Sequence, residues 1–468
     1  MHSSTPELHH VLQDRTASLV EEIDGPTIAK GAVIDRLLDL RNIGSGRDLG
    51  LELSIDEMLE TVPAGMMISS EWWMTCLCQL ADHAAFLAAG YSGASRIGYR
   101  LAPPHRFAPN ELGGPAMDNE RAKAFMSTMV DTLNSGSLAL MMSIGHRTGL
   151  FDQLAGMGFV TSVELANAAS LDERHVREWL AAMASGGVVD YDASSERFEL
   201  PVEHQRLVTR AGGPLNLAST MQTIGLLAAV EDDVVESFRT GSGVPYSRYP
   251  DFQAWMAEQS AARFDAALLD VILPSIPGAT EALTGGATLA DIGCGSGHAI
   301  ILMAQAFPNS SFVGIDFADD GLAVARERSE DAGLENVEFL NIDAAELDIA
   351  ERFDFVTSFD AIHDQAQPDR VLENIYSSLV ANGTYLCVEP AAHSALADNM
   401  TELVAPYQYT ISTMHCMSVS LAGGGEGLGT AWGADHIAQA LDTAGFSDLQ
   451  TIEVKPDRTN SYVVCHKR

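Results

Sequence analysis

TLADIGCGSGHAIILMAQAFPNSSFVGIDF, residues 288–317, is the stretch that decides the fold of this 468-residue chain. An apolar run leads into a glycine-rich turn, an apolar helix and a second apolar run that ends in Asp316, which is the order of half a Rossmann-like unit. Gly293, Gly295 and Gly297 allow a sharp turn and a close approach of a ligand to the backbone. The amides that open the following helix can hold a carboxylate or a phosphate. The stretch therefore predicts a ligand site at the edge of a parallel sheet.

The acid at the end of the second apolar run indicates the kind of ligand. Asp316 lies 21 positions after Gly295, where a carboxylate can accept hydrogen bonds from both hydroxyls of a ribose. This placement predicts an adenosine-containing ligand. The G-x-G-x-x-G fingerprint of dinucleotide-dependent oxidoreductases needs a third glycine where this chain has His298, so the glycine spacing argues against a dehydrogenase.

Two more acids stand at the ends of predicted strands. Asp291 lies two residues before the first glycine, where its carboxylate can bind an ammonium group directly or through water and would repel a pyrophosphate. Asp343 ends the run VEFLNID and can accept a hydrogen bond from an adenine amino group, while Ala344 leaves room for the ring. Either acid alone can also be an ordinary strand-end or helix-capping carboxylate. The joint order of the acids carries the prediction.

This order, D-x-G-x-G-x-G followed by acids that end the second and third strands, resembles the class I S-adenosylmethionine-dependent methyltransferases over about residues 279–468. The resemblance implies S-adenosylmethionine as the cofactor and adds Phe317, Phe359 and Asp360 as candidate contacts to it. It also implies an α/β fold with a seven-stranded Rossmann-like sheet into which the seventh strand inserts antiparallel. We expect the last four strands within residues 352–365, 383–390, 447–454 and 460–467.

Residues 161–201 have the pattern of a winged helix. A short helix capped by Thr161 or Ser162 precedes a second helix that opens at Leu171–Asp172 and ends at Gly186–Gly187. The runs VVDYD and RFELP then predict two short strands, the hairpin of a wing. Such a module either places its second helix in a DNA major groove or serves as a packing and dimerising unit.

The charge of the chain bears on this choice. Lys and Arg number 27 against 64 Asp and Glu, a formal net charge of −37 that repels phosphate backbones and anionic membrane surfaces. We therefore expect the winged helix to dimerise the chain rather than bind nucleic acid. The first residues do not resemble a secretory signal, and no apolar run reaches the roughly 18 residues of a membrane span. A cytoplasmic homodimer without membrane partners is the expectation.

The chain divides into four predicted regions. Residues 1–110 form an all-helical segment of unknown role, with helical periodicity over Glu7–Arg41 and Ile55–Ala89, and end in a turn-rich stretch before Asp118. The winged-helix domain follows at 119–213, with a continuous helical run over Asn119–Phe151 at its start. A helical linker at 214–278, in which Tyr246 and Trp255 belong to the core or roof a pocket, leads to the catalytic domain at 279–468.

His363 is the candidate catalytic residue. It lies in the D-A-x-H-D-Q motif of residues 360–365, which resembles a bacterial group of winged-helix methyltransferases. Plant-type O-methyltransferases with a similar H-D motif place a general base at this histidine. A neutral imidazole can deprotonate a hydroxyl near neutral pH. The plant-type motif continues with tryptophan where this chain has Gln365. The alternative is that His363 braces the helix that begins near Pro368, and Asp364 either orients the imidazole or opens that helix.

The segment at about 391–433 is predicted to form the acceptor pocket. Within it, Tyr407, His415 and Trp432 are candidate substrate contacts, although each can equally pack the insertion. The glycines between Gly423 and Gly429 predict a mobile or unusually turned loop.

The expected reaction is methylation of a small-molecule acceptor, most readily at a hydroxyl, with the acceptor itself unreadable from sequence. Two alternatives remain open. Arsenite methylation would require Cys294, Cys387, Cys416 or Cys465 to converge on the sulfonium. A regulator that senses S-adenosylmethionine without turnover would place the winged helix on DNA. The six cysteines lack C-x-x-C spacing, and no metal site is predicted.

Overall fold

The computed structural model describes residues 27–29, 67–69, 118–455, 457 and 459–468. The chain separates into two compact units, Met1–Pro115 and Ala116–Arg468. In the first unit, strands β1 (Thr27–Ala29) and β2 (Met67–Ser69) pair antiparallel. The helical prediction is wrong at these two short segments, whose β-branched Thr27, Ile28 and Ile68 favour an extended backbone. The rest of the predicted N-terminal helices lies outside the described residues.

The second unit begins with the winged helix, whose local signals act as the sequence predicts. Thr161 caps α7 in a reciprocal capping box with Glu164, Asp172 caps α8, and Gly186 ends it. The predicted run over Asn119–Phe151 is interrupted at Gly149, which has a φ of 72°. The elements are α5 (Asn119–Arg147), α6 (Leu150–Leu154), α7 (Ser162–Ala169), α8 (Glu173–Ser185), β3 (Asp190–Asp192), β4 (Arg197–Glu199) and α9 (Val202–Val208).

Helices link the winged helix to the sheet. Trp255 is buried in their core and donates from Nε1 to the carbonyl of Ser219 over 3.0 Å, so it belongs to the packing rather than to a pocket roof. His146 of α5 contacts Glu258 of α13 through Nε2 and Oε1 at 2.8 Å. The elements are η1 (Arg210–Leu215), α10 (Leu217–Thr220), α11 (Gln222–Ala228), α12 (Glu231–Thr240), η2 (Tyr246–Arg248), α13 (Phe252–Ala267), η3 (Leu268–Ile272), α14 (Leu273–Ser275) and α15 (Ala279–Gly285).

The second unit is built around a seven-stranded sheet in the order β10-β11-β9-β8-β5-β6-β7. Strands β5 to β9 run parallel where they pair, and β11 pairs antiparallel with both β9 and β10. The predicted seven-stranded sheet with an antiparallel seventh strand is confirmed. Its strands are β5 (Thr288–Ile292), β6 (Ser311–Asp316), β7 (Val337–Asn341), β8 (Phe353–Phe359), β9 (Leu379–Pro390), β10 (Ser447–Ile452) and β11 (Asn460–His466).

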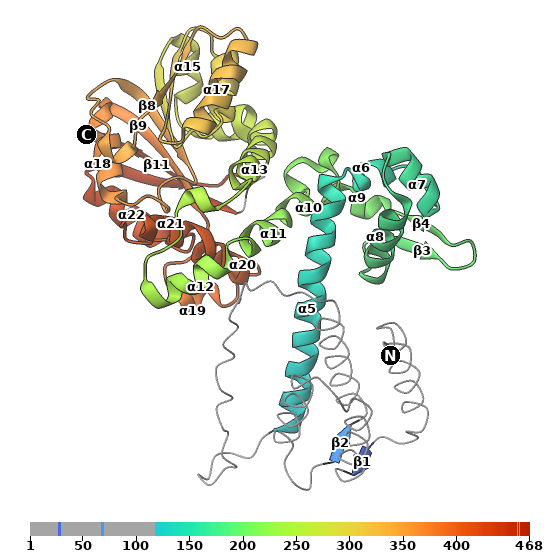
Figure 1. Cartoon of the computed structure of the whole chain (residues 1–468). Coiled ribbons are helices and arrows are strands. Elements are labelled where there is room, and N and C mark those ends of the chain that lie inside the picture. The colour runs from blue at the N-terminus through green and yellow to red at the C-terminus, as the bar shows by residue number, and fades with distance from the viewer. Residues whose placement is uncertain (1–26, 30–66, 70–117, 456, 458) are drawn as a thin grey trace, which may run out of the picture. The chain divides into compact units, whose positions relative to one another are not determined.

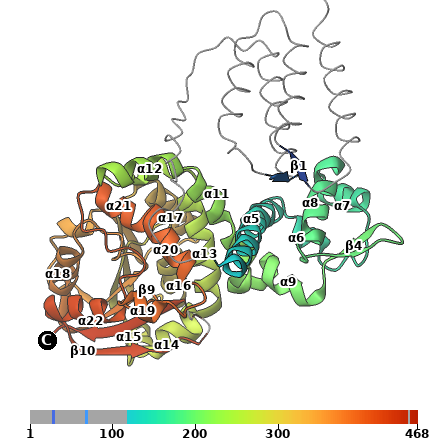
Figure 2. The ribbon, with the colours of Figure 1, turned by 90° about the horizontal axis from the view of Figure 1, so that it is seen from below.

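Helices cover both faces of the sheet (Figures 1 and 2). Successive residues of β5 point to opposite faces of the sheet, so Leu289 belongs to the core with α13 to α16 and Ala290 to the core with α18 and α22. The covering helices are α16 (His298–Ala306), α17 (Asp319–Asp331), α18 (Pro368–Ser378) and α22 (Ala434–Thr443). Between β9 and α22 lie α19 (Leu396–Asn399), α20 (Ala405–Ile411), the π-helix η5 (Ser412–Cys416) and α21 (Met417–Ala422).

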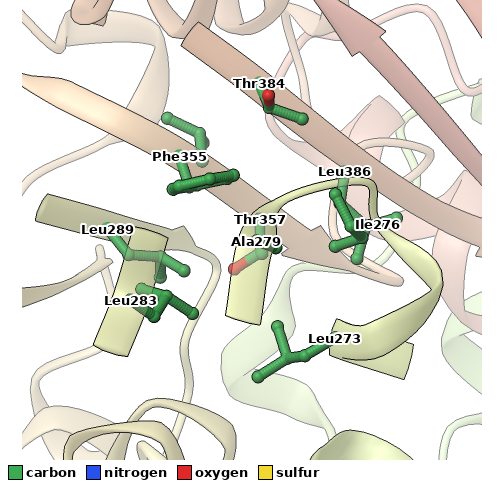
Figure 3. Close-up of a pocket in the computed structure, with 10 residues that line it drawn as sticks. Leu273, Ile276, Ala279, Leu283, Leu289, Phe355, Thr357, Thr384 and Leu386 are labelled. Carbon is green, nitrogen blue, oxygen red and sulfur yellow. The ribbon is translucent and has the colours of Figure 1, made fainter. Parts of the chain in front are cut away.

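A small apolar gap lies inside the sheet domain where α14 and α15 meet β5, β8 and β9 (Figure 3). Its volume of about 10 Å³ is near the minimum for a single water molecule. Leucines such as Leu273, Leu283 and Leu289 line it. This gap is an internal packing defect, and a nucleotide-sized ligand has to bind elsewhere.

Within the described residues, no single helix is both long and apolar enough to cross a membrane; the segments Phe252–Ser275 and Ala279–Gly285, bent by 99° at their junction, meet that criterion only as a pair.

Candidate functional site

The glycine-rich turn lies between β5 and α16, at the carboxyl end of the sheet. Gly293, Gly295 and Gly297 have φ values of 73°, 52° and 74°, which L-residues rarely adopt. A Cβ on Gly293 would stand 2.6 Å from the Cβ of Ala361, so only glycine fits there. A Cβ on Gly295 would meet nothing within 4 Å. The turn therefore has one side packed against the protein and one open side.

Asp316 closes this turn from the end of β6. Its Oδ2 accepts a hydrogen bond from the Gly295 amide at 2.8 Å, and its Oδ1 accepts from the Ala318 amide at 2.9 Å. Burial raises the pKa of the carboxyl above its usual value, and the two amides oppose that rise. Each carboxylate oxygen can accept more than one hydrogen bond, so Asp316 remains able to receive two ribose hydroxyls. The next side chain, Phe317, is largely exposed beside it.

Asp291 is buried at the end of β5, behind the turn. Thr357 donates from Oγ1 to its Oδ1 over 2.7 Å. Burial raises the pKa of Asp291 to about 7, and the charge of Asp316 adds to the rise. Neither carboxylate forms an ion pair with any residue of the described ranges. Two adjacent acids without a cation suit a ligand that brings an ammonium group and a ribose, as S-adenosylmethionine does, and they would repel a pyrophosphate.

The predicted adenine contacts are Asp343 and Ala344. Asp343 is exposed and caps the short helix η4 (Ala344–Glu346), with Oδ1 accepting from the Ala345 amide at 2.9 Å. Its other oxygen is not used by that cap. Ala344 is buried next to it. The capping role and the predicted adenine contact are compatible, and the contact stays a prediction.

Phe359 and Asp360, at the end of β8, have protein partners. Phe359 packs edge-on against Phe264, with ring centroids 4.8 Å apart. Asp360 accepts from Arg263 Nη1 at 2.8 Å and from Asn460 Nδ2 at 2.9 Å, with its backbone at a φ of 54°. These contacts fasten the strand end to α13 and β11. The predicted role of both residues in cofactor binding is not tested by these contacts.

His363 lies just beyond β8 and is paired with Glu389 at the end of β9. Its Nδ1 is 2.6 Å from Oε2 of Glu389, whose Oε1 accepts from the Ile362 amide at 2.9 Å. Both side chains are buried. Burial is the largest single effect and would lower the His363 pKa, but the charge of Glu389, the neighbouring Cys416 and the hydrogen bond to Glu389 together raise the pKa well above its usual value. A hydrogen bond from Nδ1 to a carboxylate leaves Nε2 as the nitrogen that can take a proton.

Sequence reasoning did not single out Glu389. A signal was nevertheless present in the run GTYLCVEP, which ends with an acid on the strand next to the one that precedes His363. Neighbouring parallel strands bring their carboxyl ends to the same edge, so the two side chains can be expected to meet.

The four cysteines in the described residues are all free and do not gather in one place. Cys387 and Cys465 are buried within β9 and β11. Cys294 belongs to the glycine-rich turn, and Sγ of Cys416 in η5 lies 3.6 Å from Nδ1 of His415. This scatter gives no support to a thiol cluster for arsenite. No three His, Cys, Asp or Glu side chains of the described ranges are placed to share a metal ion.

The three predicted substrate contacts of the insertion after β9 lie in different surroundings, and their contact with an acceptor stays a prediction. His415 is buried in η5, among aromatic rings that continue to Tyr246 and Phe317. Trp432 packs in the core under α22, and Tyr407 is half-buried on α20 with a pKa raised by burial. The glycine loop is unusually turned, as predicted, with positive φ at Gly424, Gly427 and Gly429.

Comparisons with known proteins agree with this geometry. Residues 136–210 match the Rv2258c-like winged HTH domain, and residues 283–443 match a methyltransferase domain family. Demethylmenaquinone methyltransferase of Listeria welshimeri is 31% identical over 106 residues, which are 22% of this chain and 45% of that protein. The chain thus spans less than half the length of the curated relatives it matches first.

Two solved structures share the fold at low identity. Human N-acetylserotonin methyltransferase, in complex with SAM, has a TM-score of 0.55 and 15% identity, over 76% of this chain and 99% of that one. Mitomycin 7-O-methyltransferase has a TM-score of 0.55 and 17% identity, over 75% of this chain and 100% of that one.

Proposed function

We propose that this chain transfers a methyl group from S-adenosylmethionine to a hydroxyl of a small molecule. The chain joins a winged-helix domain to a methyltransferase domain of the class I, S-adenosylmethionine-dependent type. The catalytic domain is assigned to residues 279–468 and the dimerising winged helix to 119–213. S-adenosylmethionine supplies a methyl group already activated by the sulfonium, so the protein mainly aligns the acceptor and manages one proton.

The cofactor would be held by the acids around the glycine-rich turn. Asp316 suits the ribose and ionised Asp291 suits the methionyl ammonium, while Gly295 leaves the open side of the turn for the ligand. Phe317, together with Asp343 and Ala344 beyond it, suits the adenine. The observation that carries this assignment is the pair of buried carboxylates whose pKa values are raised and which have no cationic partner among the described residues.

His363 would act as the general base. Nε2 takes the proton of the acceptor hydroxyl, and Glu389 stabilises the resulting imidazolium through Nδ1, 2.6 Å away. The raised pKa means that a large share of His363 is protonated near neutral pH and cannot accept a proton. We therefore expect the rate to rise with pH until His363 is neutral.

A test of the cofactor assignment is calorimetric titration of the full chain with S-adenosylmethionine, with NAD as the control ligand. Tight binding of S-adenosylmethionine alone, weakened strongly in Asp316→Ala, supports the proposal. Preference for NAD, or no binding of either ligand by folded protein, overturns it.

The winged helix is assigned to dimerisation. One side of α5 exposes apolar side chains such as Phe125, Met129 and Leu133, a surface typical of a protein contact. The basic residues of α8 are neutralised within the helix, since Arg174 pairs with Glu178 and Arg177 with Glu173. Together with the net charge of −37, this pairing disfavours the DNA-binding regulator. Absence of salt-dependent binding to random duplex DNA would agree, and a steep salt slope would overturn the assignment.

A further inference from the structure

Asp360, the residue that follows strand β8, has a backbone conformation that is rare outside glycine. Its φ is 54°, in the left-handed region, where an L-residue persists when the surrounding structure holds it. The Asp360 amide donates to the carbonyl of Val388 over 2.8 Å. Its carboxylate accepts from Arg263 Nη1 at 2.8 Å and from Asn460 Nδ2 at 2.9 Å. The turn is therefore held from three other elements, β9, α13 and β11.

This turn leads within three residues to His363. Residues 360–367 lie between β8 and α18, outside any helix or strand, so repeating backbone hydrogen bonds do not set the direction of the segment. Contacts with other parts of the chain set it instead. Ala361 is buried against the glycine-rich turn, and the Ile362 amide donates to Oε1 of Glu389 at 2.9 Å. A displacement at the start of the segment is consequently carried to His363 and its carboxylate partner.

Arg263 is a largely buried cation. Its side chain is 14% exposed and lies near two carboxylates, those of Asp360 and, at 3.7 Å, Asp457. Burial by itself would lower the Arg263 pKa, but Asp360, Tyr462 and Asp457 together raise it above its usual value. Its Nε is buried and has no hydrogen-bond partner among the residues that the structure describes. Buried ion pairs are often no more stabilising than well-packed apolar side chains, and an unpaired buried donor is unfavourable. Stability alone therefore does not account for Arg263, whereas a fixed geometry at Asp360 does.

We propose that Arg263 and Asn460 are positioning residues for the proposed general base. This inference rests on the proposed function and adds to it two residues that act only through the carboxylate of Asp360. With both donors in place, the turn directs the His363 imidazole to Glu389, 2.6 Å away, and Nε2 stays the basic nitrogen. When a donor is lost, the turn relaxes and the contact between His363 and Glu389 lengthens. A misplacement of about 1 Å can cost roughly 10²-fold in rate, so the direction of the base matters.

The test follows the His363 imidazole by NMR in full-length protein with isotope-labelled histidine, and it needs no acceptor. The His363 signals are identified by their absence in His363→Gln. Arg263→Met removes the cation, and Arg263→Lys keeps the charge without the planar guanidinium. Asn460→Ala removes two hydrogen bonds to Asp360, of 2.9 Å and 3.1 Å, and changes no charge. The control is Leu165→Ala, which lowers stability from the core of the winged helix, away from Asp360.

The sign of the change in the His363 pKa separates positioning from a direct effect of charge. Removal of a nearby cation by itself would raise this pKa, because the imidazolium would meet less repulsion. A longer contact with Glu389 would lower it. We expect a fall of about 1 pH unit in Arg263→Met and Asn460→Ala, which is part of the roughly 1–3 that a close opposite charge contributes. The fall should be smaller in Arg263→Lys and absent in Leu165→Ala.

An unchanged or higher His363 pKa in either folded variant, Arg263→Met or Asn460→Ala, overturns the inference, and so does an equal fall in Leu165→Ala. If Arg263→Met does not fold, Asn460→Ala decides alone, because it leaves every charge in place. The proposed function is tested separately, by calorimetric binding of S-adenosylmethionine to the wild type. Absence of that binding refutes the function. Binding to the wild type, together with an unmoved His363 pKa in the variants, refutes only the positioning role.

Discussion

The substitution Glu389→Gln tests the pairing at the centre of the proposed mechanism. It keeps the size of the side chain and removes its charge. The carboxylate of Glu389 accepts from two donors, the Ile362 amide at 2.9 Å and His363 Nδ1 at 2.6 Å. Glutamine has a single oxygen, so one of these donors must lose its acceptor. If the amide group turns toward Nδ1, the imidazole must take its other tautomer, which protonates Nε2 and removes the base.

The expected magnitudes follow from this geometry. An opposite charge at hydrogen-bonding distance shifts a pKa by about 1–3 units, so the His363 pKa should fall by that amount in Glu389→Gln. General-base catalysis contributes roughly 10²–10⁴-fold, and a tautomer that lacks the base should lose about 10²-fold or more in kcat. The acid limb of any remaining activity should move to lower pH.

The His363–Glu389 pair should also make the free energy of unfolding depend on pH, in a direction that follows from the His363 pKa. Because the His363 pKa is raised in the folded state, the stabilisation from Glu389 is fully present below the unfolded value of about 6.5 and is lost as pH rises through the folded pKa. Glu389→Gln should therefore lower the free energy of unfolding by about 2–4 kcal/mol at pH 6 and by less at high pH. Urea unfolding at several pH values measures this difference.

The assay that needs no acceptor is an NMR titration of the His363 imidazole nitrogens. A matched control is Glu402→Gln, because Glu402 lies 3.7 Å from His393 in a pair whose side chains are 56% and 51% exposed. Exposed pairs contribute about 0–1 kcal/mol, so that variant should leave both stability and the His363 titration unchanged. An unaltered His363 pKa in Glu389→Gln, together with an equal loss of stability at pH 6 and pH 9, would refute the reasoning.

Three further substitutions have defined outcomes. In the wild type, S-adenosylmethionine should bind more weakly below about pH 7, where the Asp291 carboxyl becomes protonated. In Asp291→Asn this pH dependence should be absent, which calorimetry across pH will measure. The same variant should be about 2–4 kcal/mol more stable than the wild type at pH 8, because an ionised buried acid is removed. Arg263→Met should cost about 3–5 kcal/mol in urea unfolding because it leaves the part-buried Asp360 charge uncompensated, and Arg263→Met combined with Asp360→Asn should recover much of that loss. Gly293→Ala should cost about 1–3 kcal/mol and weaken cofactor binding, because φ is 73° and the new Cβ meets Ala361; a Tm and an affinity equal to the wild type would contradict the geometry.

The fold was predictable from the sequence wherever the deciding interactions join residues that are close together in the chain. Thr161, Glu164 and Asp172 fix the ends of the winged-helix elements through their own backbone hydrogen bonds, and these occur as expected. The apolar runs of the sheet likewise predict strands, because both faces of a parallel sheet are buried. The short pairing of β1 with β2 was missed, since it joins segments that are distant in sequence and embedded in helical periodicity.

The site was predictable only in part, for a similar reason. Asp291 and Asp316 follow from spacing within one βαβ unit, whereas Glu389 becomes visible only when the ends of two strands are placed side by side. Asp360 illustrates the same limit: its motif predicts a ligand contact, which stays a prediction, and the sequence did not indicate that its carboxylate also accepts from Arg263 of α13 and Asn460 of β11. Contacts between distant segments decide which polar groups remain free for a ligand, and a single sequence does not contain them.

The acids behind the glycine-rich turn show why the free protein keeps an unfavourable arrangement. Burial raises the pKa of Asp291 to about 7, so its ionisation at higher pH costs folding free energy. A ligand ammonium beside it lowers that pKa again, so binding near pH 7 should release a proton, and the attraction gained offsets the cost of the buried charge. Under the proposed function, the same two acids that destabilise the free chain would favour a cationic nucleoside over a pyrophosphate. A better-packed, uncharged turn would be more stable and would lose that discrimination, which is the usual conflict between stability and a preorganised site.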